Sequence, residues 1–100
     1  ITTIIQQSGY QSALNVDVTV TPGSTRATIV HDAPLTANRT VTLLTTNATN
    51  GTRFKIVRSQ NATGAFNVDV GGLKTLTTEN QWVEVTYDGA QYRVTGYGTL

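Results

Sequence analysis

The sequence predicts an all-β domain, and three features of the 100-residue chain point to it. Charged residues make up only 13% of the chain, which is well below the usual quarter of a soluble domain. Threonine and asparagine take their place; threonine suits strands and asparagine suits turns. Short runs of alternating apolar and polar residues are separated by turn residues, as in sandwiches and barrels. We therefore expect one antiparallel β-sandwich domain over residues 1–100, jelly-roll-like, with about eight short strands.

The predicted strands follow one another along the chain without a helix between them. The polar, Gln-rich residues 1–10 are either a short strand or part of a connection from upstream that spans residues 1–13. Alternation with a period of two residues then predicts strands with one buried face, over residues 14–20, 25–31, 39–45, 52–58, 65–70, 73–77 and a final hairpin over 81–97. Turn signals such as Thr21-Pro22-Gly23-Ser24 separate these runs.

The final hairpin is the best-defined element, because Asp88-Gly89 separates two alternating runs. A two-residue type I′ turn needs positive φ at both central positions, and Asp-Gly tolerates that conformation. Such a turn would fix the register, placing Val85 opposite Tyr92 and Glu84 opposite Arg93. Apolar side chains would then meet on one face of the hairpin, and an acid would pair with a base on the other.

The composition excludes several kinds of chemistry. A net charge of +1 gives no long-range field for nucleic acid or an anionic membrane, and no apolar run is long enough to span a bilayer. The absence of cysteine excludes disulfides and thiol nucleophiles. The single histidine, His31, cannot by itself form a zinc site. The adjacent Asp32 could not orient it, because it would point to the opposite face of the strand. We expect no metal, no cofactor and no enzymatic activity in this domain.

Short repeats in the chain have simple interpretations. Asn-Val-Asp-Val occurs at 15–18 and again at 67–70, which we attribute to chance because few residue types fill these strands.

The glycines of Gly96-x-Gly98 open no helix and are interpreted as bends. Four Asn-x-Ser/Thr sequons would carry glycans in a secreted eukaryotic protein, although a chain rich in these residues also produces them by chance; they begin at Asn38, Asn47, Asn50 and Asn61.

Two groups of side chains are candidates for binding. By parity, Trp82 lies on the face opposite Val83, and Arg53 and Lys55 share a solvent face of one strand. Aromatic rings and polar groups together suit a sugar, so the candidate carbohydrate-binding residues are Trp82, Arg53, Lys55 and Tyr97. Arg39 and Arg58 are further cations that could meet an acidic sugar. The second group consists of large apolar residues predicted to face away from the core and to form a subunit interface: Val30, Leu44, Val57 and Leu76.

Residues 35–100 resemble a known family of domains. The motifs are Gly51-Thr52-Arg53-Phe54-Lys55-Ile56-Val57-Arg58, Ala62-Thr63-Gly64-Ala65-Phe66, and Trp82-Val83-Glu84-Val85-Thr86-Tyr87-Asp88-Gly89-Ala90-Gln91-Tyr92. Their order is similar to that in the small C-terminal β-domains of bacteriophage tailspikes and tail fibres. The first 34 residues match no pattern of that family.

The resemblance implies a homotrimer at the tip of a virion fibre, acting outside the cell. Such domains lock the trimer, aid its folding and in some cases bind bacterial surface polysaccharide or lipopolysaccharide, whereas any depolymerase lies in an upstream domain. The start at Ile1 agrees with a piece of a longer chain. The alternatives are a purely structural virion protein without a ligand, such as a capsid decoration protein or fibre cap, and a glycan-active enzyme.

Overall fold

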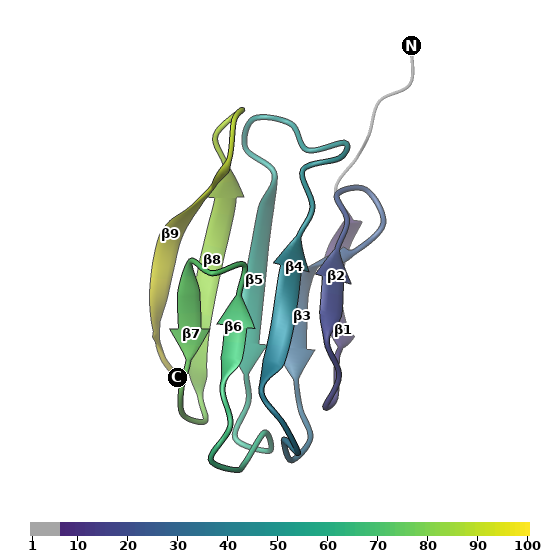
Figure 1. The fold of residues 1–100 in the computed structure, drawn as a ribbon. Coiled ribbons are helices and arrows are strands. Elements are labelled where there is room, and N and C mark those ends of the chain that lie inside the picture. The colour runs from purple at the N-terminus through teal and green to yellow at the C-terminus, as the bar shows by residue number, and fades with distance from the viewer. Residues whose placement is uncertain (1–6) are drawn as a thin grey trace.

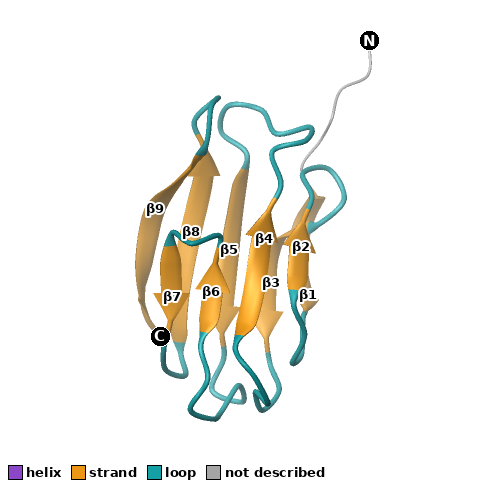
Figure 2. Ribbon diagram, viewed as in Figure 1, coloured by secondary structure: helices purple, strands orange, loops and turns teal. Residues whose placement is uncertain are grey.

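The computed structural model describes residues 7–100, and within them it contains nine β-strands and no helix (Figures 1 and 2). No helix in this part of the chain could therefore cross a membrane. The strands form two layers, a five-stranded sheet with the order β1-β3-β5-β8-β9 and a four-stranded sheet with the order β2-β4-β6-β7. Their bounds are β1 Gln7–Ser12, β2 Val18–Val20, β3 Arg26–His31, β4 Arg39–Leu43, β5 Arg53–Arg58, β6 Val68–Val70, β7 Lys74–Leu76, β8 Gln81–Tyr87 and β9 Tyr92–Thr99. The predicted all-β class is confirmed.

The path of the chain differs from the predicted antiparallel jelly roll. The first six strands alternate between the two sheets, and each of β3 to β6 pairs in parallel with the strand two places earlier. The chain thus makes three stacked turns, and each turn contributes one strand to each sheet. Strands of one sheet run parallel because the chain passes through the other sheet before it comes back in the same direction. The antiparallel pairs are β5 with β8, β6 with β7 and β8 with β9. Both sheets are therefore mixed, and the antiparallel prediction is wrong.

The stacking explains the repeated Asn-Val-Asp-Val motif. Val18 is paired with Val41, and Val41 with Val70, so residues 15–18 and 67–70 occupy the same place in the first and third turns. Val41 and Val70 are fully buried and Val18 is half-buried, which favours an apolar side chain at this place in each turn. In the second turn, Asn38 Oδ1 accepts a hydrogen bond of 2.9 Å from the backbone N–H of Asn67 in the third. The two copies therefore occupy equivalent structural places, which the attribution to chance did not predict.

The hydrophobic core fills the space between the two layers. The predicted inward positions Phe54 and Ile56 of β5 are fully buried, as are Val83 and Val85 of β8. Fully burying side chains of this size stabilises a fold by about 1.5–3 kcal/mol each. The core cluster consists of Ala13, Val20, Ile29, Leu35, Val41, Phe54, Ile56, Ala62, Val68, Val70, Leu76, Val83, Val85 and Tyr92.

Arg58 is fully buried at the end of β5. Its guanidinium donates to four backbone carbonyl oxygens: Nε to Ala62 at 2.9 Å, Nη2 to Gly64 at 2.9 Å, and Nη1 to Phe66 at 2.6 Å and to Leu76 at 3.3 Å. Three of these acceptors belong to the loop between β5 and β6, which is therefore folded around the side chain. Arg58 is a structural residue and cannot be the solvent-facing cation that we considered for an acidic sugar.

Two strands begin three or four residues later than predicted. Leu14 has a φ of 51°, which ends the extended conformation, so the run over 14–20 becomes a strand only at Val18–Val20. The run over 65–70 becomes a strand only at Val68–Val70, because Phe66 belongs to the loop held by Arg58. Within the predicted upstream connection, Gln7–Ser12 form β1, and the rest of the predicted 1–10 strand lies outside the described residues.

The final hairpin has a longer turn than the Asp-Gly pair predicts. Tyr87 is paired with Tyr92 and Val85 with Val94, so the loop contains four residues, 88–91. The carboxylate of Asp88 favours this loop because Oδ1 accepts hydrogen bonds of 2.9 Å from the backbone N–H groups of both Ala90 and Gln91. The hairpin is confirmed, but its predicted register is wrong.

The predicted ion pair across the hairpin also changes. Arg93 Nε donates to Asp88 Oδ2 at 2.8 Å, and this hydrogen bond is the main cause that lowers the pKa of Asp88 to about 2. A shift of register between Glu84 and Val85 places Glu84 opposite Gly96. Glu84 instead lies 4.0 Å from Arg53, on the neighbouring strand.

Candidate functional site

The five-stranded sheet has an outer face, which we define as the side turned away from the four-stranded sheet. Since Phe54, Ile56, Val83 and Val85 point into the core, the residues between them point outward. Three cross-strand pairs of β5 and β8 therefore lie on the outer face: Arg53 with Thr86, Lys55 with Glu84, and Val57 with Trp82. The predicted sugar contacts Trp82, Arg53 and Lys55 come together here.

The Trp82 ring packs against β9 at two glycines, so no β9 side chain separates the ring from the backbone. Its partner in β9 is Gly98. A Cβ added to Gly98 would stand 3.2 Å from the indole Nε1 and 3.4 Å from Cε2 and Cζ2, and one added to Gly96 would stand 3.4 Å from Cη2 and Cζ3. Such similar distances to several ring atoms indicate that the broad face of the indole covers the glycines. The Trp82 ring therefore packs on the backbone of Gly96 and Gly98, which are part of strand β9. Their interpretation as bends is wrong.

The ammonium of Lys55 is directed at this ring. Lys55 Nζ lies 4.7 Å from the centroid of the Trp82 ring, a distance typical of a cation–π contact. Glu84 stands directly opposite Lys55, but its carboxylate lies 4.0 Å from Arg53 Nε and accepts a 3.2 Å hydrogen bond from Thr95 Oγ1. The site thus combines a half-buried indole, an adjacent ammonium and an exposed guanidinium.

Tyr97, the fourth predicted sugar contact, lies on the other side of the sheet. It is paired with the inward-pointing Val83, yet 64% of its surface is exposed. Lys74 of β7 places its Nζ 4.2 Å from the centroid of the Tyr97 ring. The structure therefore contains two separate aromatic–cation pairs, and Tyr97 does not contribute to the outer face.

The predicted interface residues do not form one surface. Val30 is paired with Val57, and Val57 with Trp82, so these three follow one row across the outer face. Leu76 is fully buried in the core, because it is paired with the inward-pointing Val68. Leu44 follows β4 in the other sheet. The prediction that all four apolar residues face outward together is wrong for Leu44 and Leu76.

One residue of the outer face is not among the binding residues predicted from the sequence. Tyr10 of β1 is 67% exposed and stands opposite Thr28, which in turn is paired with Lys55. It therefore points outward at the β1 edge. Alternation gave no signal for it, because the surrounding residues are polar and rich in glutamine.

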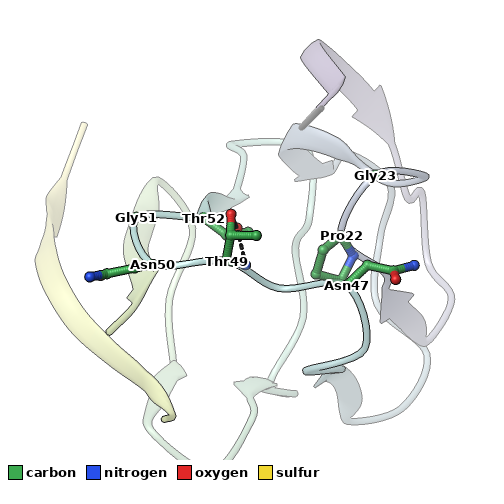
Figure 3. A pocket seen from close by; sticks show the side chains of 7 residues that line it. All are labelled: Pro22, Gly23, Asn47, Thr49, Asn50, Gly51 and Thr52. Carbon is green, nitrogen blue, oxygen red and sulfur yellow. Dashed lines mark hydrogen bonds between the residues drawn. The ribbon is translucent and has the colours of Figure 1, made fainter. Parts of the chain in front are cut away.

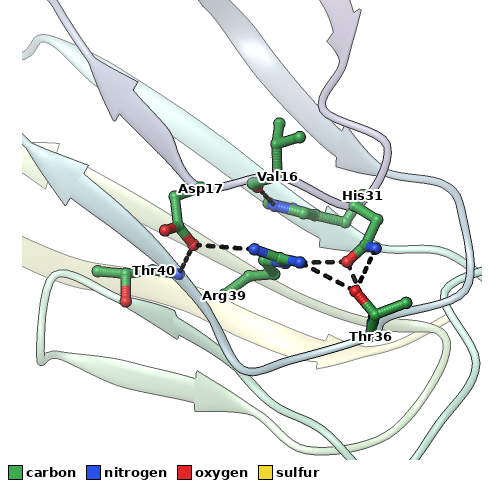
Figure 4. Close-up of polar contacts among 7 residues, drawn as sticks. Val16, Asp17, His31, Thr36, Arg39 and Thr40 are labelled. Atoms are coloured by element: carbon green, nitrogen blue, oxygen red, sulfur yellow. Dashed lines mark hydrogen bonds and ion pairs between the residues drawn. The ribbon is translucent and has the colours of Figure 1, made fainter.

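A polar network fastens the β1–β2 loop to the β3–β4 loop (Figure 4). Arg39 Nε donates to Asn15 Oδ1 at 2.9 Å, and Arg39 Nη2 donates to Thr36 Oγ1 at 3.1 Å. Asp17 Oδ1 accepts a hydrogen bond of 3.0 Å from the backbone N–H of Thr40 and lies 3.9 Å from Arg39 Nη1. With its side chain 19% exposed, Arg39 serves this network and not the outer face.

His31 is part of the same region and is fully buried. Its Nε2–H donates to the carbonyl oxygen of Val16 at 3.0 Å, and burial lowers the pKa of the imidazole. Asp32 does not orient it, since the Asp32 carboxylate accepts hydrogen bonds from Ser59 and Asn61. Residues 7–100 contain no group of three or more acidic or histidine side chains placed to hold a metal ion.

Two pockets lie away from the outer face. A polar pocket of about 190 Å³ opens between the β2–β3 turn and the β4–β5 loop (Figure 3), and a groove of about 390 Å³ runs between β4, the Gly71-Gly72-Leu73 turn and the β8–β9 turn. Neither is lined by a carboxylate, a histidine or a cationic side chain. The outer face is therefore the stronger candidate, because it joins an aromatic ring to charged groups.

No match to this chain was found among protein-family models, curated proteins or solved structures. The geometry of the outer face and the resemblance carried by residues 35–100 are the observations that bear on function.

Proposed function

We propose that this chain is the C-terminal trimerising cap and host-surface carbohydrate-binding domain of a bacteriophage tailspike or tail fibre. The observation that carries the proposal is the Trp82 indole, held flat on Gly96 and Gly98 beside Lys55. A sugar ring can stack on such a surface while polar neighbours satisfy its hydroxyl groups. The domain is adhesive and structural, and it acts on the virion outside the cell.

The topology supports the role of a cap. Three parallel turns of chain are followed by the antiparallel strands β7, β8 and β9. In stacked architectures the terminal unit departs from the repeat and closes the core. At the other end, β1 and β2 are the edge strands of the two sheets, where a further parallel layer can pair.

The outer face offers separate places for a subunit and for a sugar. Tyr10, Val30 and Val57 lie on β1, β3 and β5, whereas Trp82 lies on the next strand, β8. Val57 is already covered within the chain, with only 8% of its surface exposed, so contact between subunits through Tyr10 and Val30 would leave Trp82 at the rim of the interface. A glycan would then bind along the groove between two subunits.

The trimer is tested by light scattering coupled to size exclusion. We expect the wild-type mass to be that of three chains, and the double variant Tyr10→Asp/Val30→Asp to run as a folded monomer because charge enters an apolar contact. Val94→Asp, on the opposite side of the sheet, is the matched control and should remain trimeric. A wild-type monomer, or an unchanged mass in the double variant, would contradict the proposed interface.

Sugar binding is tested by titrating the protein with purified bacterial capsular polysaccharides and lipopolysaccharides. Trp82 is the single tryptophan, so its fluorescence reports on the site directly. We expect Gly98→Ala, which pushes a methyl group against the ring, to weaken binding at least tenfold, about 1.4 kcal/mol. Trp82→Leu should abolish binding when it is measured by calorimetry.

Tyr97→Leu is the control for these variants, because it removes an aromatic ring from the other side of the same sheet and should bind normally. Unchanged binding by Trp82→Leu would remove Trp82 from the site. A trimer that binds no polysaccharide would favour the purely structural alternative, and release of glycan fragments would favour the enzyme.

A further inference from the structure

Cationic side chains are concentrated on the outer face of the five-stranded sheet. Four of the seven Lys and Arg residues lie on or beside the outer face of the five-stranded sheet: Arg26, Arg53, Lys55 and Arg93. Arg26 shares this face because Thr28, two residues on, is paired with Lys55, and Arg93 is paired with Thr86. The carboxylates Asp17 and Asp69 lie on the four-stranded sheet, on either side of Thr40. A chain with a net charge of only +1 thus presents a cationic face where the indole is.

The carboxylates of the outer face are engaged by other groups. Glu84 is held by Arg53 and Thr95, and Asp88 in the adjoining turn is held by Arg93 at 2.8 Å. Within residues 7–100 the ammonium of Lys55 has no carboxylate at ion-pair distance, and it contacts the Trp82 ring instead. The positive charge nearest the proposed stacking surface is therefore not neutralised by an acid of this chain.

This arrangement favours a ligand that brings its own negative charge. A sugar that stacks on Trp82 must displace the ammonium from the ring, and cation–π contacts at exposed sites are weak. A neutral sugar offers the ammonium only uncharged hydroxyl oxygens as acceptors in return. An acidic sugar offers the ammonium a charge-assisted hydrogen bond, which is shorter and stronger than a neutral one.

We propose that the outer face selects anionic saccharides, bearing a carboxylate or a phosphate, with Lys55 as the residue that determines this specificity. The inference rests on the proposed carbohydrate binding and adds the chemical class of the glycan. The sugar ring lies on Trp82, its anionic group pairs with Lys55, and Arg53 adds to the attraction from the next cross-strand row.

The experiment compares each polysaccharide with a neutral form of itself. The probes are polygalacturonate, hyaluronan and polysialic acid, each beside its methyl ester, a phosphate-bearing teichoic acid, and the neutral glucans dextran and maltoheptaose. Binding to the wild-type protein is measured by calorimetry at low and at high salt. We expect at least one acidic probe to bind tenfold or more tightly than its ester or the neutral glucans, with the preference reduced by salt.

Two lysine variants separate a specific role from general charge. Lys55→Met should remove the preference for the acidic form over its neutral form. Lys74→Met removes the other lysine that lies over an aromatic ring and should keep the preference. A preference retained in Lys55→Met would overturn the role of this residue.

The remaining outcomes each decide the question. Equal binding of acidic and neutral forms by the wild-type protein would overturn this inference and leave the proposed function standing. Binding of duplex DNA as tightly as the best acidic saccharide would also overturn it, since the face would then respond to charge alone. Failure to bind any saccharide, acidic or neutral, would overturn the proposed function itself.

Discussion

Replacing Arg58 with leucine should lower the free energy of unfolding by at least about 3 kcal/mol. The substitution leaves four carbonyl oxygens without their donor, those of Ala62, Gly64, Phe66 and Leu76. Two of these hydrogen bonds, those to Ala62 and Leu76, are buried, and each buried polar group left unsatisfied costs roughly 1–3 kcal/mol. A domain of this size has only about 5–15 kcal/mol in total. Urea denaturation followed by tryptophan fluorescence measures the change.

The matched control is Arg53→Leu on the same strand. Arg53 faces solvent with its side chain 63% exposed and lies 4.0 Å from Glu84, so its loss should change stability by no more than about 1 kcal/mol. If Arg58→Leu does not fold, Arg58→Lys keeps the charge but not the planar fork, and it should fold with intermediate stability. Equal stability of the Arg58 and Arg53 variants would show that the loop does not depend on the guanidinium.

The burial of Arg58 follows from the alternation of the strand but not from the charge of its side chain. Because Phe54 and Ile56 point inward, the period of two places residue 58 on the buried face as well. The positive charge suggested solvent instead, since a buried arginine requires partners. Those partners are backbone carbonyls of a loop and of β7, and side-chain patterns do not show where a loop turns its carbonyl groups.

The same limit explains the difference in topology. An alternating strand has the same pattern in a parallel as in an antiparallel sheet, so the hydrophobic pattern predicts the strands and not their partners. The repeat of Asn-Val-Asp-Val was the available signal for stacked turns. Its middle copy, residues 38–41, keeps only the first and last residues of the motif, which hides the repeat in the sequence.

The hairpin shows how a local signal can predict an element and miss its register. Both registers place apolar residues opposite one another, because Tyr92 and Val94 have the same parity. The Asp88 carboxylate decides between them through its hydrogen bonds to Ala90 and Gln91. A two-residue turn leaves no room for these contacts.

Parity located most of the candidate site. It placed Trp82, Arg53 and Lys55 on a face away from the core, and β5 and β8 are neighbours in the sheet. Parity alone could not show that Gly96 and Gly98 lie under the indole, because that contact depends on the register of β9 after the irregularity at Glu84. Parity alone also could not exclude Tyr97 from the site, because the same register decides on which side of the sheet Tyr97 lies.

Leu76→Ala should cost about 2–5 kcal/mol, the range for truncating a leucine that is completely enclosed. Leu76 is fully buried, so the substitution leaves a cavity bounded by the core and by the loop around Arg58. Leu44→Ala removes the same atoms from a half-buried position after β4 and should cost less than half as much. Chemical denaturation of both variants measures the difference.

The comparison of these two leucines also separates a core role from a subunit role. If Leu76 acts only within the core, Leu76→Ala lowers the free energy of unfolding by the same amount at every protein concentration at which the oligomeric state is constant. Its solution mass stays that of the wild type. A dissociated but otherwise stable Leu76→Ala variant would instead place Leu76 between subunits, which would require β7 to move away from the core that now encloses this side chain.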